Sequence, residues 1–379
     1  MTPGTASRQR PSPTAAQPAD FLPIQGWDHI EFYVGNARQA AHFYRTFMGF
    51  DIVAYSGLET GNRQTASYVV SQGEIRFVLT TALGPDHEIA RLCQLHGDAV
   101  RAVALRVPDV ETAVRETQKR GATVVRPPAA QEDEFGTYKS AAIRTYGDVI
   151  HVFVERAKYR GVFAPGYQPF AAPKAPAVGL AHLDHVVGNV ELGAMNHWVN
   201  FYASVMGFSQ LAHFDDKDIS TEYSALMSKV MQNGTGKIKF PINEPAEGRR
   251  KSQIEEYLDY NRGPGVQHIA MGTGDIVKTV RALRANGMQF LRVPDTYYEM
   301  LPERVGKIGE DYRTLQELGI LADRDDEGYL LQIFTQPVQD RPTLFFEVIE
   351  RHGSRGFGKG NFKALFVSIE EEQRRRGNL

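Results

Sequence analysis

Two segments of the chain share one order of apolar and polar positions. Each begins with Asp-His at the head of a short apolar strand, continues into an amphipathic helix and closes with Met-Gly-Phe, as in WDHIEFYVGNARQAAHFYRTFMGF from Trp27 and LDHVVGNVELGAMNHWVNFYASVMGF from Leu183. Apolar residues recur at i, i+3, i+4, i+7 and i+8, the spacing of one buried helix face. They are Ala40, Phe43, Tyr44, Phe47 and Met48 in the first copy and Trp198, Phe201, Tyr202, Val205 and Met206 in the second. These aromatic residues are therefore predicted to be core.

Two further pairs of segments extend the repeat. GDAVRAVALRVPDVETAVRETQKRGATVVRPP from Gly97 aligns without gaps to GPGVQHIAMGTGDIVKTVRALRANGMQFLRVP from Gly263. Both predict a strand, a helix that begins at an aspartate and a glycine that stops the helix. GDVIHVFVER, ending at Arg156, matches the end of RPTLFFEVIER, ending at Arg351. The chain is therefore predicted to be a duplication.

Helices followed by several short strands, repeated, predict an α+β fold with mixed sheets in two tandem domains. A Pro- and Ala-rich stretch separates the halves, and a last helix is predicted over 363–374. The expected units are a disordered tail at 1–20, an N-terminal domain without metal at 21–157, a linker at 158–178 and a C-terminal catalytic domain at 179–379 that includes the last helix.

Composition narrows the classes of function. The formal net charge of the 379 residues is -2, which gives no bias towards nucleic acid or anionic membranes, so a small molecule is the expected partner. A run of about 18 apolar residues, as a membrane span needs, is absent from the sequence. We therefore expect a cytoplasmic protein. Because Cys93 is the single cysteine, any metal must be held by His, Asp or Glu.

Differences between the halves mark candidate chemistry, because the two copies share fold-making residues but need not share function. Three positions stand out: His185 against His29, His268 against Ala102, and Glu347 against Val152. A scaffold alone requires neither His nor Glu there. Two imidazoles and one carboxylate on three strands form the ligand set typical of non-haem iron(II) oxygenases, which leave positions open for substrate and dioxygen.

Strand alternation supports this assignment. His268 shares a face with Val266 and Ala270, and Glu347 shares one with Phe345 and Ile349. A carboxylate in so apolar a strand needs a cation, because burying an unpaired charge costs several kcal/mol. The alternative is a buried ion pair with Arg or Lys. The other histidines lack such a pattern, and packing or surface roles are expected for them.

Several stretches of the second half also match a known family. They are FPINEP (240–245), RKSQIEEYL (250–258), GPGVQHIA (263–270), LGILADRDDEGYLLQIFTQPVQDRPTLFFEVIER (318–351) and GFGKGNF (356–362). In these the chain resembles the 4-hydroxyphenylpyruvate dioxygenases of the vicinal oxygen chelate superfamily, which are built from paired βαβββ modules. The resemblance implies one Fe(II) per chain and the conversion of 4-hydroxyphenylpyruvate and O2 to homogentisate and CO2. It further implies a place in tyrosine and phenylalanine catabolism and a homo-oligomer, a dimer rather than a tetramer.

The resemblance also implies which residues bind substrate or order the pocket. They are Ser224, Pro241, Asn243, Gln253, Gln267, Gln332, Phe334, Phe345, Phe357, Asn361 and Phe362. The residues themselves also single out Gln332, because an amide in the apolar run LLQIF is unusual and Gln332 shares a strand face with Phe334. The glycine-rich GFGKGNF lacks the strand-to-helix context of a phosphate loop, so we expect it to hinge the last helix as a gate.

Three rival functions stay open at this stage. 4-Hydroxymandelate synthase resembles the chain in fold and ligands, and Phe334 is the discriminating position because the mandelate enzymes tend to have an aliphatic residue there. An extradiol ring-cleaving dioxygenase shares the ligand set but should not need the PINEP and KSQI stretches. A metal-free, drug-sequestering binding protein of the same superfamily would not need the three ligands.

Overall fold

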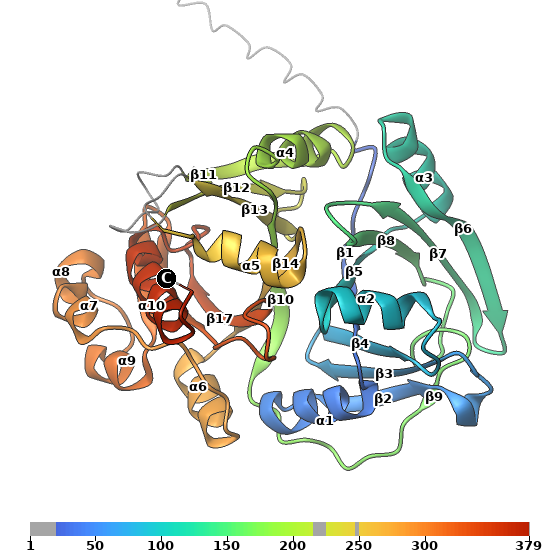
Figure 1. Cartoon of the computed structure of the whole chain (residues 1–379), viewed down its shortest axis with the longest axis horizontal. Coiled ribbons are helices and arrows are strands. Elements are labelled where there is room, and N and C mark those ends of the chain that lie inside the picture. Colours follow the sequence, from blue (N-terminus) through green and yellow to red (C-terminus); the bar gives the residue numbers. More distant parts are fainter. Residues whose placement is uncertain (1–19, 215–224, 247–249, 379) are drawn as a thin grey trace, which may run out of the picture.

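The computed structural model describes residues 20–214, 225–246 and 250–378. All but one residue of the tail expected at 1–20 therefore lie outside the described residues. Within these ranges the strands form two sheets, one in each half of the chain, that lie side by side (Figure 1). The fold is α+β, as predicted.

The first half contains these elements: β1 (Gly26–Tyr33), α1 (Ala37–Met48), β2 (Asp51–Ser56), β3 (Thr65–Gln72), β4 (Ile75–Ala82), α2 (Glu88–His96), β5 (Ala99–Arg106), α3 (Val110–Lys119), β6 (Val124–Asp133), β7 (Gly136–Arg144), β8 (Ile150–Glu155) and β9 (Gln168–Pro169). The second half contains β10 (Leu180–Asn189), α4 (Met195–Ser204), β11 (Ser209–Phe214), β12 (Ala225–Gln232), β13 (Lys239–Ala246), α5 (Gln253–Asn261), β14 (Gly265–Thr273), α6 (Ile276–Ala285), α7 (Asp295–Glu299), α8 (Leu301–Val305), α9 (Tyr312–Leu318), β15 (Leu321–Asp325), β16 (Gly328–Phe334), β17 (Phe345–His352) and α10 (Phe362–Arg375).

The strand order confirms the duplication. It runs β6-β7-β8-β5-β1-β4-β3-β2 in the first sheet and β15-β16-β17-β14-β10-β13-β12-β11 in the second. In both halves the first strand pairs parallel with one neighbour and antiparallel with the other. The first sheet has the additional edge strand β9, which pairs with β2.

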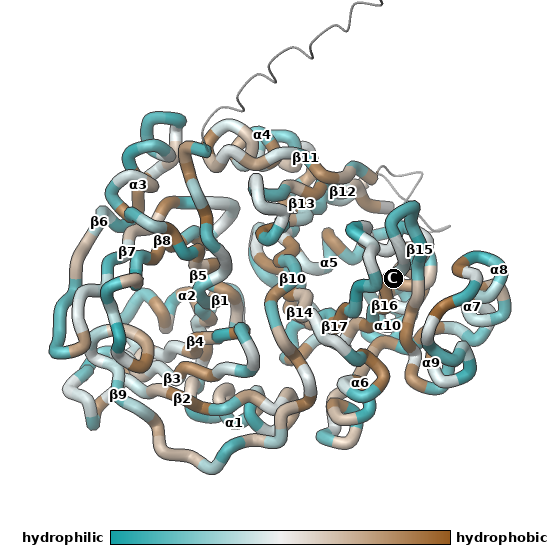
Figure 2. Tube along the Cα trace, turned by 180° about the vertical axis from the view of Figure 1, so that it is seen from behind, coloured by the Kyte–Doolittle hydropathy of each residue, from teal (hydrophilic) through white to brown (hydrophobic). Residues whose placement is uncertain are grey.

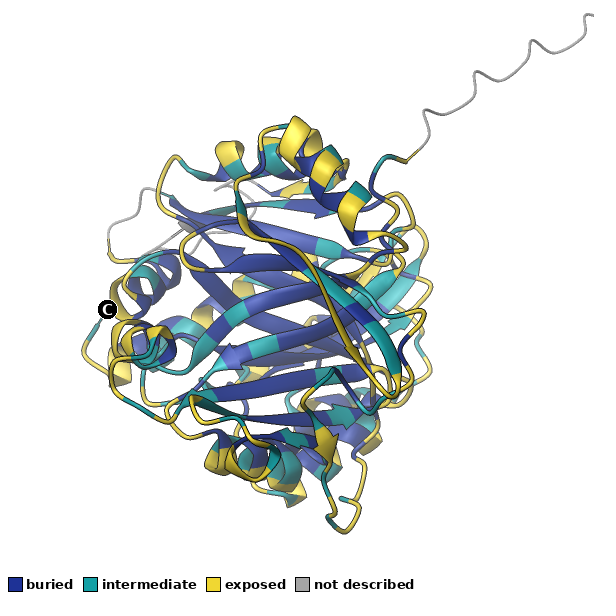
Figure 3. Ribbon diagram, turned by 90° about the vertical axis from the view of Figure 1, so that its right-hand side faces the viewer, coloured by how far each residue is buried: buried dark blue, intermediate teal, exposed yellow. Residues whose placement is uncertain are grey.

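The helices predicted from the repeat, α1, α3, α4 and α6, form where the sequence places them. Asp109 and Asp275 accept hydrogen bonds from backbone N–H groups in the first turns of α3 and α6, so each satisfies a donor that the helix leaves unpaired. Tyr44 of α1 and Tyr202 of α4 are buried on the faces of these helices that pack against the core. Buried positions follow the strands while the outer helix faces are exposed, and the apolar positions lie along the strands (Figures 2 and 3). In the described part of the chain, no helix has both the length and the apolar character that a membrane crossing requires.

The inner face of the first sheet is filled by its own chain. Tyr159, Phe163 and Ala164 pack against Ala102, Val152 and neighbouring small residues in one apolar cluster. The ring of Phe163 lies 5.2 Å from that of His29 in an edge-on contact. The segment expected as a linker therefore contributes core residues to the first half.

The second half carries two additions that the first half lacks. One is the helical insertion α7–α9 between α6 and β15, and the other is α10, which coincides with the predicted last helix. In Figure 1, α10 lies over the open side of the second sheet, and α7–α9 stand beside it. The second sheet is therefore capped by helices instead of being filled by a loop.

His151 of β8 joins the two halves. It is fully buried and packs against the tilted ring of Phe240, while its Nε2 lies 2.8 Å from the hydroxyl of Tyr202 in α4. Its Nδ1 lies 3.3 Å from the carbonyl oxygen of Val103, which can only accept, so Nδ1 carries the proton and Nε2 accepts from Tyr202. Burial lowers the pKa of His151 from 6.5 to about 4.

The depressed pKa predicts a pH-dependent stability. The unfolded chain takes up a proton at His151 near pH 6.5, whereas the folded chain resists it until about pH 4. Stability from this group is therefore complete above pH 6.5 and is lost as the pH falls towards 4, by up to about 3 kcal/mol. Urea unfolding across this range should show a smaller loss of stability in His151→Gln than in the unmodified protein. Parallel pH curves for both proteins would disprove the assignment.

Candidate metal centre

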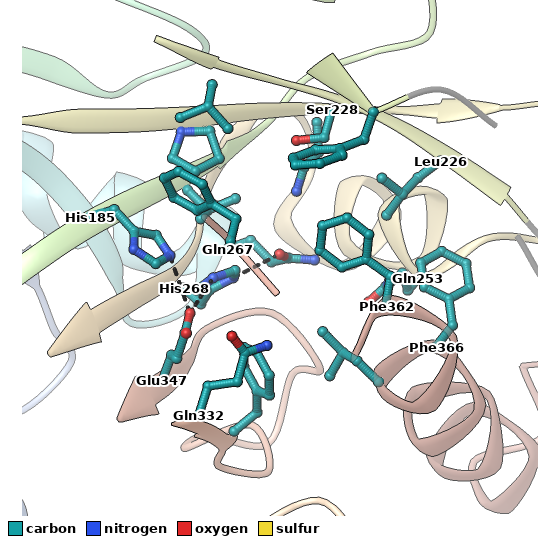
Figure 4. Close-up of a pocket in the computed structure, with 18 of the residues that line it drawn as sticks. His185, Leu226, Ser228, Gln253, Gln267, His268, Gln332, Glu347, Phe362 and Phe366 are labelled. Carbon is teal, nitrogen blue, oxygen red and sulfur yellow. Dashed lines mark hydrogen bonds and ion pairs between the residues drawn. The ribbon is translucent and has the colours of Figure 1, made fainter. Parts of the chain in front are cut away.

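Three adjacent central strands bring His185, His268 and Glu347 together. His185 of β10 pairs with Ala270 of β14, which pairs in turn with Glu347 of β17, so the first and third side chains stand at the same level. His268 lies two residues before Ala270 and so faces the same side of the sheet. One carboxylate oxygen of Glu347 is 3.1 Å from Nε2 of His185 and 3.4 Å from Nε2 of His268 (Figure 4). The potential ligand atoms all lie within 4.8 Å of one another.

The other ring nitrogens are held by neighbouring side chains. Nδ1 of His185 lies 2.7 Å from the Asp184 carboxylate, and Nδ1 of His268 lies 3.0 Å from the amide oxygen of Gln267. Adjacent residues in a strand normally face opposite sides, but the register shift at Asp184 lets its side chain meet His185. Both acceptors fix the proton on Nδ1, which leaves Nε2 as the free ligand atom.

Arg351 balances the buried charge of Asp184. Its Nε and one terminal nitrogen contact the two carboxylate oxygens at 2.7 and 2.8 Å. Burial acts to raise the pKa of Asp184, but Arg351 and His185 hold it well below its usual range. Arg351 is therefore committed to Asp184 and forms no ion pair with Glu347.

The electrostatics of these three side chains suit a bound cation. Burial acts to raise the pKa of Glu347, but the charge and hydrogen bonding of the two imidazoles outweigh it and lower the pKa to about 2. For His185, burial acts to lower the pKa, and Glu347 and Asp184 raise it overall. Burial dominates at His268 and lowers its pKa. Within the described residues Glu347 forms its ion pairs with the two histidines and not with Arg or Lys, which argues against a buried ion pair with Arg or Lys.

The first half repeats the aspartate and arginine support but keeps only one of the three ligand-type residues, His29. His29 contacts Asp28 at 2.7 Å, and Arg156 binds the same aspartate at 2.6 and 2.7 Å. Pairing of β1, β5 and β8 puts Ala102 and Val152 at the positions of His268 and Glu347. These correspondences match those read from the sequence: Ala102 to His268 and Val152 to Glu347.

A pocket opens from the three ligands, and most residues expected around substrate line it. Those on its wall are Pro241, Asn243, Gln253, Gln267, Gln332, Phe334, Phe345, Phe357 and Phe362. Figure 4 shows Gln267 and Gln332 near His268 and Glu347, and Gln253 on the opposite side beside Phe362 and Phe366. Ser224 lies outside the described residues. Asn361 is buried but is not on the wall, since its side-chain oxygen accepts hydrogen bonds from Tyr297 and Arg304.

Other wall residues were missed from the sequence. They are Val187, Phe214, Leu226, Ser228, Val230, Leu365 and Phe366. Leu226, Ser228 and Val230 alternate along β12, so the period-two rule could have found them once that strand had been placed. Leu365 and Phe366 are ordinary core-like residues of an amphipathic helix, and only the docking of α10 gives them a role.

The segment before α10 is fastened to the helical insertion. Arg304 of α8 donates to the carbonyl oxygen of Gly360 at 2.5 Å and to the side chain of Asn361 at 2.9 Å. Gly358 has a φ of +73°, and a Cβ there would come within 2.6 Å of Gln332. The cavity is about 80 Å³, well below the roughly 300 Å³ of the smaller ligand sites. Entry of a substrate of ordinary size therefore requires side chains of the pocket wall to move.

Comparisons with known proteins agree with this fold. The model of the glyoxalase/bleomycin resistance protein/dioxygenase superfamily matches residues 26–145 and 182–333, and the chain belongs to this superfamily. Within it, the chain is a member of the 4-hydroxyphenylpyruvate dioxygenase family. It is 50% identical to the 4-hydroxyphenylpyruvate dioxygenase of Danio rerio over 93% of this chain and 91% of that one. It is 45% identical to that of Yarrowia lipolytica over the full length of both.

A solved structure gives the same fold. A mutant of 4-hydroxymandelate synthase from Streptomyces coelicolor superposes with a TM-score of 0.84 at 33% identity, covering 93% of this chain and all of the other. A protein of the rival activity therefore shares the fold. The fold alone does not separate the two reactions.

Proposed function

We propose that the chain is an iron(II)-dependent dioxygenase that converts 4-hydroxyphenylpyruvate and O2 to homogentisate and CO2. The observation that carries this proposal is the buried group of His185, His268 and Glu347 at the base of a largely apolar pocket. Family membership supplies the substrate. One iron per chain, a cytoplasmic homodimer and a place in tyrosine breakdown go with this function.

The donor set fits iron(II). Two neutral imidazoles and one carboxylate leave coordination positions open and match the facial triad of non-haem iron oxygenases. Iron(II) held by these residues would bind the 2-oxo acid group of the substrate and activate dioxygen beside it. The protein holds both histidines in the ligand-ready tautomer through Asp184 and Gln267.

The pocket walls suit an aromatic ring with a 2-oxo acid side chain. Phe334, Phe345 and Phe357 offer apolar surface next to the ligands. Gln332 has a buried amide oxygen without a hydrogen-bond partner in the described part of the chain, and Gln253 and Gln267 add further amides. Since an unsatisfied buried acceptor is costly, a substrate donor is its natural complement. Enclosure by the phenylalanines also keeps water from the reacting atoms.

A direct experiment tests the function. The protein is reconstituted anaerobically with iron(II), mixed with 4-hydroxyphenylpyruvate and exposed to air, and the product is identified. We expect homogentisate and one O2 consumed per turnover. 4-Hydroxymandelate as the product would establish the rival reaction, and no oxygen uptake would reject both.

Phe334→Ile should alter the position of hydroxylation. Phe334 pairs with Glu347 across β16 and β17, and its ring lies 5.9 Å from that of His268. The two carbons that distinguish the products are neighbours in the substrate, so a barrier change of only ~1.4 kcal/mol shifts their ratio tenfold. Loss of this aromatic wall should let the ring tilt. Chromatography should then detect 4-hydroxymandelate beside homogentisate, with iron content unchanged.

A matched control separates this effect from general loosening. Phe290→Ile makes the same change at a buried core residue that does not line the pocket, and should lower stability without altering the product. If Phe334→Ile gives homogentisate alone at an undiminished rate, Phe334 does not position the ring.

A further inference from the structure

A second cavity of about 630 Å³ lies between the two halves, away from the pocket. Its wall combines β1 and β4 of the first half with β10 and β13 of the second, and it includes Arg76, Arg106, Lys237 and Lys239. Asp184 lines this cavity while His185 lines the pocket, so the two spaces lie on opposite sides of the Asp184–His185 pair. Polar surface predominates here, in contrast with the metal-ligand pocket.

The duplication pairs the charged residues of this wall. Phe32 and Gly188 are equivalent, because each lies three residues after the histidine of its half. Phe32 pairs with Leu79 of β4, and Gly188 pairs with Ile242 of β13. Arg76 and Lys239, each three residues before these partners, are therefore equivalent as well. Asp28 and Asp184 are likewise equivalent. The repeat therefore gives the cavity one equivalent pair of a cation and a carboxylate from each half, Arg76 with Asp28 and Lys239 with Asp184.

The carboxylates of Asp28 and Asp184 are each paired with an arginine that does not line the cavity. Arg156 binds Asp28 through two nitrogens, and Arg351 binds Asp184 in the same way. The remaining carboxylate of the wall, Glu74, is exposed. Arg106 of the wall also reaches Asp28, at 3.8 Å, so the unbalanced positive charge of the wall is carried mainly by Arg76, Lys237 and Lys239.

Two of these cations are partly buried without a strong partner. Arg76 makes no hydrogen bond or ion pair within the described residues, and its guanidinium carbon lies 5.9 Å from the centre of the Phe163 ring. Lys239, whose side chain is 15% exposed, reaches Asp184 only at 4.0 Å. Burial lowers the pKa of both groups. The buried indole N–H of Trp27 on the same wall also has no partner there.

Burying a cation costs free energy unless an anion or several hydrogen-bond acceptors pair with it. We propose that this cavity binds a small multivalent oxyanion, a phosphate or a polycarboxylate, between Arg76 and Lys239. Such a ligand would contact both halves at once. Binding should therefore stabilise the folded chain, since a ligand that binds only the folded state raises its stability.

Titration calorimetry and thermal unfolding of the iron-loaded protein test this, with inorganic phosphate and citrate as separate probes. Sodium chloride at matched ionic strength corrects for screening. We expect at least one probe to bind near one per chain and to raise the Tm by a few degrees above the chloride control. Phosphate alone would indicate a phosphate ester as the natural ligand, and citrate alone a polycarboxylate.

Two variants make the result specific to the cavity. Arg76→Met and Lys239→Met remove a charge but keep a flexible side chain, and each should weaken binding at least about tenfold, which corresponds to ~1.4 kcal/mol. They also distinguish the cavity from the metal, because both leave the three ligands intact. The control is Arg313→Met, which changes an exposed residue of α9 and should bind both probes as the unmodified protein does. Absence of binding by both probes, or equal binding in all variants, would overturn the proposal.

Discussion

Glu347→Ala should strip the bound iron and abolish turnover. The carboxylate is the one anionic ligand of the group, and without it two neutral imidazoles would face the metal in a buried site. We expect iron content after anaerobic reconstitution to fall from near one per chain to a small fraction. Oxygen uptake should drop by roughly a thousand-fold or more, equivalent to at least ~4 kcal/mol. Metal analysis and an oxygen electrode give the two measurements.

His29→Ala is the matched control, because His29 has the same aspartate and arginine support as His185. It should leave the iron content near one per chain. If His29→Ala removes the metal and Glu347→Ala does not, the assignment of the metal to the second half is wrong.

A chain that ends at Gly353 should fold and bind iron but fail to couple oxygen use to product. The truncation removes Phe357, Phe362 and Phe366 from the pocket wall and leaves all three ligands on their strands. Water would then reach the reacting atoms. We expect coupled product to fall about tenfold or more, a change of at least ~1.4 kcal/mol in the effective barrier. Oxygen consumed and homogentisate formed, measured in the same sample, report the coupling.

A point variant refines this test. Arg304→Met removes the hydrogen bonds that fasten Gly360 and Asn361 to the insertion, and should reduce coupling less than the truncation does. Arg313→Met changes an exposed arginine of the same insertion and should leave coupling intact. Full coupling in the truncated chain would eliminate the gate.

Much of the fold could be predicted because the two halves of the chain can be aligned with each other. The repeated strands and helices, the Asp109 and Asp275 caps and the last helix all follow from patterns with a period of two or 3.6. The ligand assignment came from differences between copies. The insertion α7–α9 was not predicted, since its short helices have no counterpart in the first half.

Contacts over long sequence distances explain the rest. Phe163 lies in a stretch that looks like a linker, and its packing against His29 depends on how the chain returns to the sheet. The meeting of Asp184 with His185 depends on a register shift, and hydropathy does not reveal such a shift. Asn361 shows the same limit, because its partners Tyr297 and Arg304 belong to the insertion.

The repeated Asp–His–Arg arrangement bears on the order in which the protein is assembled. Asp28, His29 and Arg156 hold the same contacts in a half that lacks two of the three ligands, so the arrangement needs no cation to form. In small zinc domains, by contrast, the binding energy of the metal is the folding energy. We therefore expect the chain to fold before it takes up the proposed metal, so that removal of the metal by a chelator should leave the folded structure intact.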